Sequence, residues 1–192
     1  MKAVLVSIRP EWCRLIVDGK KTIEVRKTCP KLETPFKCYI YCTYGQGLIE
    51  RYDAVYPNML IDQTVSKNAI WGNCCNGKVI GEFICDKTTM SIPGYKDNVA
   101  AYWELLDGTC LTADELMDYG QWKTLYGWHI SSLYIYDKPL ELSEFMKPCK
   151  DDLFCEVCAM YNEFRERCGN GALMIKRAPQ SWCYVEEVSH EA

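Results

Sequence analysis

The sequence is poor in histidine, the residue that most often serves as a general base. Only two of its 192 residues are histidines, and neither belongs to a pattern that indicates a Ser-His-Asp or Cys-His catalytic pair. His129 lies at the start of a predicted strand, where a lone histidine is more often a hydrogen-bonded structural residue than a base. His190 lies near the end of the chain. The sequence therefore offers no histidine-based hydrolytic site.

Long apolar runs are also missing. No stretch approaches the roughly 20 consecutive apolar residues that cross a bilayer, and Arg9 and Glu11 follow the opening apolar run too closely for a signal peptide. We therefore expect a cytoplasmic protein with no membrane-spanning segment.

Basic residues are not in excess, because 22 Lys and Arg stand against 26 Asp and Glu, for a net charge of -4. This balance argues against nonspecific coating of nucleic acid, which requires many cations against phosphates. The charge is uneven along the chain, however. Between residues 9 and 31 the basic residues outnumber the acidic ones, with Arg9, Arg14, Lys20, Lys21, Arg26, Lys27 and Lys31 against Glu11, Asp18 and Glu24. A local basic face is consistent with this segment.

Hydrophobic patterning predicts several short strands and a few helices, without the regular strand-helix alternation of a doubly wound sheet. Apolar or alternating runs indicate strands at residues 3–8, 22–27, 36–43, 78–86 and 127–142. Helical spacing and capping residues indicate helices at 10–18, 98–106 and 112–119. Residues 44–77 lack periodicity and are expected to form a long irregular insertion. The pattern favours an α+β protein with a small mixed or antiparallel β-barrel.

The strand at residues 22–27 concentrates charge. Ile23 and Val25 alternate with Thr22, Glu24 and Arg26, so the apolar face is expected to meet the core and the polar face to be exposed. Charged residues on this segment, together with an aromatic side chain, suit a phosphate and a base. The alternative is a solvated strand edge with ordinary ion pairs. The residues in question are Lys20, Lys21, Glu24, Arg26 and Lys27, next to Trp12.

Cysteine is abundant, with 13 residues. The odd number and the absence of an export signal favour free thiols over a disulfide scaffold, and Cys38 and Cys42 are expected to be small buried hydrophobes. A different pattern follows Cys149, where the spacing x5, x2 and x9 suits four thiolates around one structural zinc ion. The predicted ligands are Cys149, Cys155, Cys158 and Cys168. Buried free thiols, an iron-sulfur cluster, and Cys183 in place of Cys149 remain alternatives.

Six tryptophans offer platforms on which bases stack, although tryptophan is usually buried. We expect Trp12, Trp128 and Trp182 to be the exposed ones.

Four segments together resemble the ASCH family (activating signal cointegrator homology) of the PUA-like superfamily: SIRPEWCRLIVDGKKTIEVRK, FKCYIYCT, GKVIGEF and LYGWHIS. They cover roughly residues 3 to 140. The ending APQSWCYVEE resembles a phage and gut-bacterial branch of the family. The resemblance implies a PUA-like β-barrel with a cleft beside GKKT, in a superfamily that includes RNA-binding domains and readers of modified bases.

Some small bacterial members resemble amidohydrolases that act on acylated cytidine, and others resemble ribonucleases. The amidohydrolase lysine falls on Lys21, but the nucleophilic threonine position holds Glu24, and a carboxylate does not simply replace an activated hydroxyl. Asp107 is the nearest match for the acidic partner. We therefore do not carry this activity over as the main hypothesis.

Our main hypothesis is an RNA- or modified-nucleotide-binding protein, with an ASCH domain at residues 1–145 and a Cys-rich, zinc-stapled extension at 146–192. The first alternative is a hydrolase acting on RNA or an acylated nucleoside, with Lys21 and Glu24 as acid and base. The second is a protein-interaction module. The predicted ligand-binding residues are Trp12, Lys20, Lys21, Glu24, Arg26, Lys27, Trp128 and Trp182.

Overall fold

A computed structural model describes residues 1–44, 75–92, 99–149 and 171–188. Within these ranges the strands are β1 (Lys2–Ile8), β2 (Ile23–Arg26), β3 (Phe36–Cys42), β4 (Lys78–Ser91), β5 (Leu125–Leu140) and β6 (Trp182–Glu186). The helices are α1 (Pro10–Val17), α3 (Val99–Thr109) and α4 (Ala113–Gly120), and short 3-10 turns are formed at Leu142–Glu144 and Gly171–Leu173. Most of the expected insertion at 44–77 lies outside the described residues. The predicted α+β class is confirmed.

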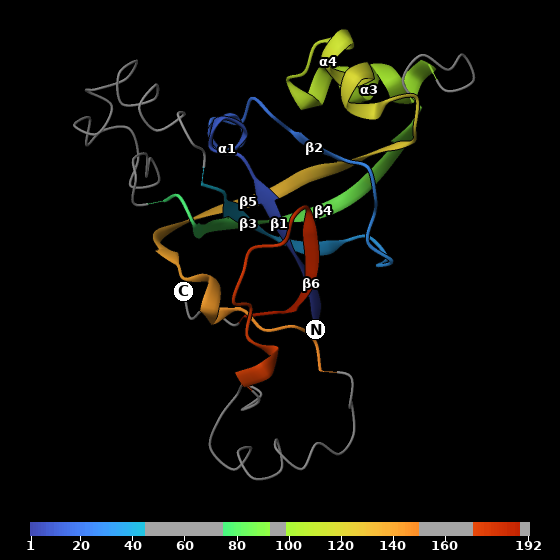
Figure 1. Cartoon of the computed structure of the whole chain (residues 1–192). Coiled ribbons are helices and arrows are strands. Elements are labelled where there is room, and N and C mark those ends of the chain that lie inside the picture. Colours follow the sequence, from blue (N-terminus) through green and yellow to red (C-terminus); the bar gives the residue numbers. More distant parts are fainter. Residues whose placement is uncertain (45–74, 93–98, 150–170, 189–192) are drawn as a thin grey trace, which may run out of the picture.

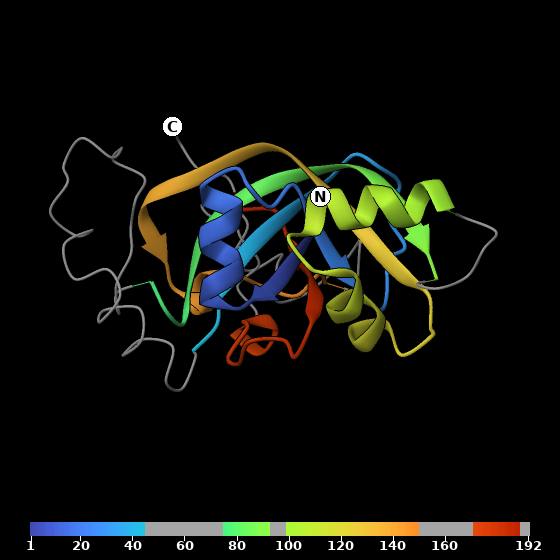
Figure 2. The ribbon, with the colours of Figure 1, turned by 90° about the horizontal axis from the view of Figure 1, so that it is seen from above.

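The six strands form one mixed sheet in the order β2-β5-β4-β3-β1-β6. β1 and β3 are parallel, with Val4 opposite Cys38, and every other ladder is antiparallel. The parallel pair requires a crossover, and α1 and β2 lie within it. All three helices lie on the upper side of the molecule in Figure 1, and the view from above shows them in front of the strands (Figure 2).

The helix ends follow local chemistry. Pro10 is at the first helical position of α1, and Gly19 adopts a positive φ of 69° just after it. Thr112 and Glu115 form the predicted capping box at the start of α4. The left-handed residue that ends α4 is Gln121, because Gly120, expected just past the end, is still helical.

Gly81 marks a close approach between β4 and β5, as its position within a strand indicates. A Cβ at this position would lie 2.4 Å from the carbonyl oxygen of Tyr134. The β4–β5 register shifts on both sides of it, between Val79 and Gly81 and between Glu82 and Ile84. These bulges bend the long strands and help the sheet to curl.

β2 is buried on both faces, so the expectation that Glu24 and Arg26 face solvent is wrong. Ile23 and Val25 pack with Leu105 of α3 in one small apolar cluster. The opposite face turns toward β1, β6 and the main core, and Glu24 and Arg26 are buried there. A strand covered on both faces carries its polar side chains into the interior, where they need partners.

The two edges of the sheet meet through side chains. Trp182 at the start of β6 donates its indole N–H to Thr28 Oγ1 just beyond β2, at 2.9 Å. The hydroxyl of Tyr184 accepts from the backbone N–H of Lys31 at 2.7 Å. β2 and β6 are at opposite ends of the strand order, so these contacts draw the curled sheet into a barrel-like shape without a ladder between them.

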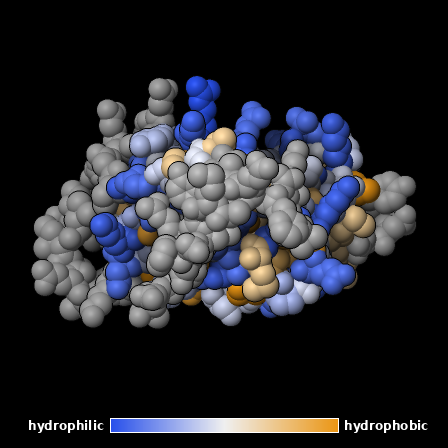
Figure 3. Space-filling model, turned by 90° about the horizontal axis from the view of Figure 1, so that it is seen from below, coloured by the Kyte–Doolittle hydropathy of each residue, from blue (hydrophilic) through white to orange (hydrophobic). Residues whose placement is uncertain are grey.

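The predicted domain boundary at residue 145 stays a prediction. β6 comes from the predicted extension, and it pairs with β1 from Lys2 to Val6. Among the described helices, none has the length and apolar character needed to cross a membrane. On the face seen from below, hydrophilic side chains predominate among the coloured residues, and hydrophobic ones form small patches (Figure 3).

Candidate functional site

Lys21, Glu24 and Arg26 form a buried ion cluster, called here the Lys21–Glu24–Arg26 cluster. Arg26 Nη2 lies 2.8 Å from Glu24 Oε1, and Lys21 Nζ lies 3.5 Å from Glu24 Oε2. The three residues are only 3%, 5% and 9% exposed in sequence order. Two cations against one carboxylate leave a formal charge of +1 away from bulk water, which is costly unless further acceptors are present.

Lys21 is held at the end of α3. Its ammonium donates to the carbonyl oxygen of Thr109 at 2.9 Å and lies 5.3 Å from the ring centroid of Trp12. Burial lowers the pKa of Lys21 below its ordinary value, and the neighbouring Glu24 opposes that shift. The carboxylate of Glu24, the carbonyl of Thr109 and the ring of Trp12 therefore all stabilise the charged form of Lys21.

Arg26 ties β2 to the other edge of the sheet. Nη2 donates to the carbonyl oxygen of Ser7 at 2.5 Å, and Nη1 lies 3.5 Å from Ser181 Oγ. Its Nε is buried and has no hydrogen-bond partner within the described structure. The guanidinium therefore keeps at least one unused donor, and its side chain, 11% exposed, is the most accessible of the cluster.

Trp128 is fully buried, so the expectation that it is exposed is wrong. The β2–β5 register sets it directly opposite Glu24 on the inner face of the sheet. Its ring packs edge-on against Phe36 and Trp182, at centroid distances of 6.1 and 5.9 Å. Trp128 Nε1 is buried and unpartnered within the described residues. Trp128 is thus a core residue packed beside Glu24, and it does not offer a free face on which a base can stack.

Trp12 and Trp182, the other two expected platforms, are half-buried. Within the described residues, the most exposed tryptophans are instead Trp103 and Trp122, at 62% and 70%. Trp122 belongs to the turn after α4, and no strand or helix pattern in the sequence distinguishes it from a core residue.

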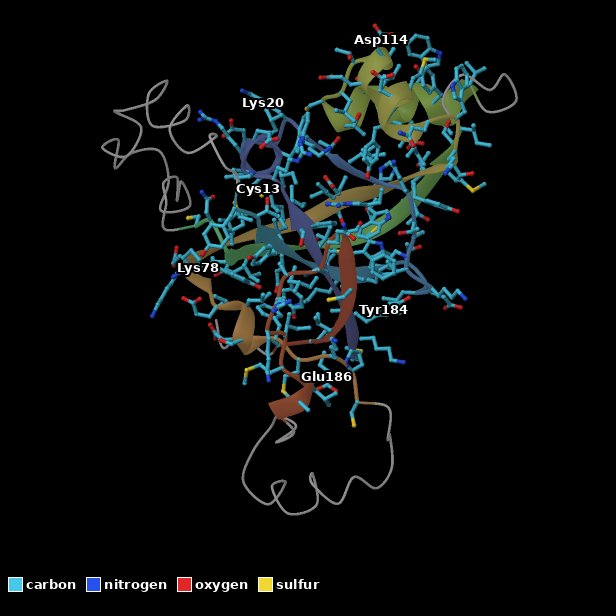
Figure 4. The ribbon with its side chains drawn as sticks, viewed as in Figure 1. Cys13, Lys20, Lys78, Asp114, Tyr184 and Glu186 are labelled. Carbon is cyan, nitrogen blue, oxygen red and sulfur yellow. The ribbon has the colours of Figure 1, made fainter. Side chains whose placement is uncertain are left out.

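Exposed cations surround the cluster. Lys20 and Lys27 are exposed, as is Arg9; Figure 4 labels Lys20 at the end of α1. Lys20 Nζ lies 3.8 Å from Asp18 Oδ2, an exposed pair that contributes little. Of the predicted ligand-binding residues, the fold therefore gathers Lys21, Glu24 and Arg26 in one cluster and leaves Lys20 and Lys27 beside it in solvent.

Tyr119 is a neighbour that the sequence reading missed. The ammonium of Lys27 lies 5.0 Å from the centroid of its ring. Burial raises the pKa of Tyr119, Arg26 and Arg9 lower it, and Glu24 raises it, so this ring lies within electrostatic reach of the cluster. Only the packing of α4 beside β2 brings position 119 here, because no local spacing connects it with residues 21–26.

His129 belongs to a second polar network, away from the cluster. Its Nε2 lies 2.8 Å from Thr89 Oγ1 and 3.4 Å from Glu104 Oε1, and Thr89 Oγ1 donates to Glu104 Oε2 at 2.9 Å. Lys87 also pairs with Glu104. Burial lowers the pKa of His129, and Glu104 opposes the shift. These contacts fasten α3 to β4 and β5, in line with the structural role expected for His129.

Asp107, the acidic partner implied by the amidohydrolase resemblance, is exposed on α3. Among the described residues, the ion pair of Lys21 is with Glu24, and no ion pair joins Lys21 to Asp107. The described residues therefore do not bring Lys21 and Asp107 together as the amidohydrolase resemblance implies.

Three of the four predicted zinc ligands, Cys155, Cys158 and Cys168, lie outside the described residues, so the zinc site stays a prediction. Cys149 is described, half-buried, and its backbone N–H donates to Glu186 Oε1 at 3.3 Å. In the parts of the chain that the structure describes, no group of His, Cys, Asp or Glu side chains is arranged to hold a metal. Cys38 and Cys42 are buried free thiols, as predicted.

No protein-family model and no curated protein matches the chain. Solved structures similar to it include the ASCH protein from Zymomonas mobilis, at 15% identity and a TM-score of 0.49 over 96% of this chain and 88% of that one. Two single-residue mutants of the Zymomonas mobilis protein match at 15% and 14% identity, with TM-scores of 0.48 and 0.49. They cover 97% and 96% of this chain, and the matched parts are 92% and 89% of theirs. These structures are members of the family that the sequence resembles, and the phage and gut-bacterial branch stays a prediction.

Proposed function

We propose that the protein binds RNA or a nucleotide-like ligand at the Lys21–Glu24–Arg26 cluster. The observation that carries the proposal is a cluster with a formal charge of +1 in which the Arg26 side chain, 11% exposed, is the most accessible member. A phosphate or a base carbonyl oxygen is a suitable acceptor, because guanidinium forms strong charge-assisted bonds with such groups. Glu24 holds the two cations in place and retains lone pairs for a base amino group.

The surroundings support a nucleotide over a simple anion. Tyr119 and Trp12 bring aromatic rings to the cluster, each with a lysine ammonium near its face. Single-stranded and unpaired bases are recognised by stacking on such rings combined with contacts to phosphate. The exposed cations Arg9, Lys20 and Lys27 attract the backbone from solution.

Fluorescence anisotropy with a labelled mixed-sequence single-stranded RNA, and competition by mononucleotides and acylated cytidine, test the proposal. Binding is expected to weaken steeply between 50 and 200 mM salt, since phosphate contacts release counterions. Arg26→Lys keeps the positive charge but removes the planar guanidinium with its paired N–H donors. We expect Kd to rise by about tenfold or more, in keeping with loss of a charge-assisted hydrogen bond.

Lys138→Gln provides the matched control, because Lys138 is an exposed cation toward the far end of β5. Urea unfolding of each variant confirms that the fold is retained. The absence of binding to all of these ligands at low salt, or an unchanged Kd in folded Arg26→Lys, would contradict the proposal.

One observation favours a hydrolase in the same place. Burial lowers the pKa of Lys21, and a lowered pKa makes the protonated lysine a stronger acid. In that case Lys21 and Glu24 are the acid and the base. Turnover of RNA or of acylated cytidine that is lost in Lys21→Met would support this second function, and no turnover in the native protein would exclude it for those substrates.

A further inference from the structure

Residues 27–31, which follow β2, connect three aromatic side chains from two distant parts of the chain. Lys27 lies against the ring of Tyr119, Thr28 accepts from the indole of Trp182, and the backbone of Lys31 donates to the hydroxyl of Tyr184. The rings of Trp182 and Tyr184 are 5.3 Å apart between centroids. We call this surface the 27–31 strip.

The strip is accessible and positively charged. Lys27, Thr28 and Lys31 are exposed, Tyr119 is 36% exposed, and Trp182 and Tyr184 are half-buried. No acidic residue lies between Val25 and Leu32 in the sequence, while that interval contains Arg26, Lys27 and Lys31. Tyr184 is labelled on β6 in Figure 4, on the side of the sheet away from Lys78.

The strip begins at the cluster. Arg26 directly precedes Lys27 in the chain, and its Nη1 lies 3.5 Å from Ser181 Oγ, next to Trp182. A ligand held by Arg26 therefore has Lys27 with the ring of Tyr119, and Ser181 with Trp182, as its immediate neighbours. The chain bends at Lys27, Thr28 and Lys31, so residues 27–31 span less than the about 14 Å of an extended segment. This length accommodates at most about four nucleotides at a stacked spacing of roughly 3.4 Å.

We propose that the 27–31 strip is a binding track for a single-stranded polynucleotide that extends from the Lys21–Glu24–Arg26 cluster, with bases against the Tyr119 and Trp182–Tyr184 rings and phosphates at Lys27 and Lys31. This inference rests on the proposed function, because the strand is anchored at Arg26. The combination of a basic line with successive aromatic rings is the arrangement that binds single strands independently of sequence. An acidic peptide would use the lysines but gain little from the rings.

Binding of diuridylate, hexauridylate and hexathymidylate, measured by anisotropy or calorimetry, tests the inference. We expect a hexamer to bind at least tenfold more tightly than the dimer, and the preferred sugar to identify RNA or DNA. Tyr184→Ala, which removes a ring beside Lys31 at the other end of the strip from Arg26, should weaken hexamer binding by about 5- to 150-fold, the range expected for loss of a stacking ring, and change dimer binding less than twofold. Lys27→Gln with Lys31→Gln should reduce the salt slope by about 1.4.

Tyr134→Ala and Lys138→Gln are matched controls at the other end of β5, where Tyr134 is 54% exposed. If hexamer and dimer bind alike, or the strip variants bind hexamer as the native protein does while Arg26→Lys weakens both, the track is wrong and the proposed function stands. If neither oligomer nor any nucleotide binds, both are wrong. Equal competition by polyglutamate would also overturn the track, because it would show that charge alone is being recognised.

Discussion

Arg26 Nη2 donates to the carbonyl oxygen of Ser7 at 2.5 Å, and this contact joins the edge strand β2 to β1 across the interior of the curled sheet. Three strands separate β2 from β1 in the sheet order, so the two residues meet only because the sheet bends back on itself. The same guanidinium pairs with Glu24. The Lys21–Glu24–Arg26 cluster is thus part of the fold as well as the proposed binding site.

Glu24→Gln is expected to destabilise the protein by about 3–5 kcal/mol, because it leaves two buried cations without their carboxylate. Burial lowers the pKa of Lys21 and Glu24 opposes that shift, so without Glu24 the lysine loses its proton more readily. The loss should therefore be smaller at pH 9 than at pH 6. Urea unfolding at both pH values measures it.

The control for this substitution is Glu33→Gln, which removes an exposed carboxylate and should change the free energy of unfolding by less than about 0.5 kcal/mol. A cost below about 1 kcal/mol for Glu24→Gln would show that the cluster does not depend on its carboxylate.

Stability is expected to fall as the pH rises above about 9. Burial raises the pKa of Cys13 and Cys38 well above the ordinary 9.0, and it raises the pKa of Cys85 to about 12. The unfolded thiols therefore ionise first, and the stability that is fully present below pH 9 is lost on going higher. Cys38→Ala should make the fall shallower by up to about 1.4 kcal/mol per pH unit.

Urea unfolding under reducing conditions between pH 8 and 11 follows this effect. Cys110→Ala removes an exposed thiol and should leave the slope unchanged. A slope in Cys38→Ala as steep as that of the native protein would mean that this thiol does not take part.

Gly127→Ala should separate α3 from β2. A Cβ at this position would lie 2.3 Å from Leu105 Cδ2 and 2.8 Å from Ile23 Cγ2, two buried side chains. Forcing an extra carbon into such packing costs typically about 1–3 kcal/mol. Gly171→Ala is the control, because its Cβ would meet nothing within 4 Å. Equal midpoints of urea unfolding for the two variants would contradict the tight packing at Gly127.

The zinc hypothesis is tested by metal analysis of the purified protein. If Cys149, Cys155, Cys158 and Cys168 bind a structural zinc ion, nearly one equivalent per chain is expected, since such a site is filled in folded protein. Cys158→Ser should remove the metal, while Cys110→Ser should not. Less than about half an equivalent of zinc per chain excludes the zinc site. Iron together with acid-labile sulfide would instead support an iron-sulfur centre at these cysteines.

Local patterns predicted most elements because each of them depends on neighbouring residues. Pro10 and Gly19 bound α1, the Thr112–Glu115 capping box begins α4, and Gly81 accompanies the bulges of β4. The side on which a residue is buried depends on distant partners. The exposed face expected for β2 and the exposure expected for Trp128 were wrong because β1, β6 and Phe36 cover them. Tyr119 was missed for the same reason.

The sequence by itself determined most of the elements, although not β6, together with the free buried thiols and the close spacing of Lys21, Glu24 and Arg26. Only the tertiary structure decided that these three side chains are buried together and that residues 27–31 lie against Trp182 and Tyr184. The physical reason is separation along the chain: more than 150 residues lie between Thr28 and Trp182, and curling of the sheet brings its two edges together at a distance that no local pattern encodes.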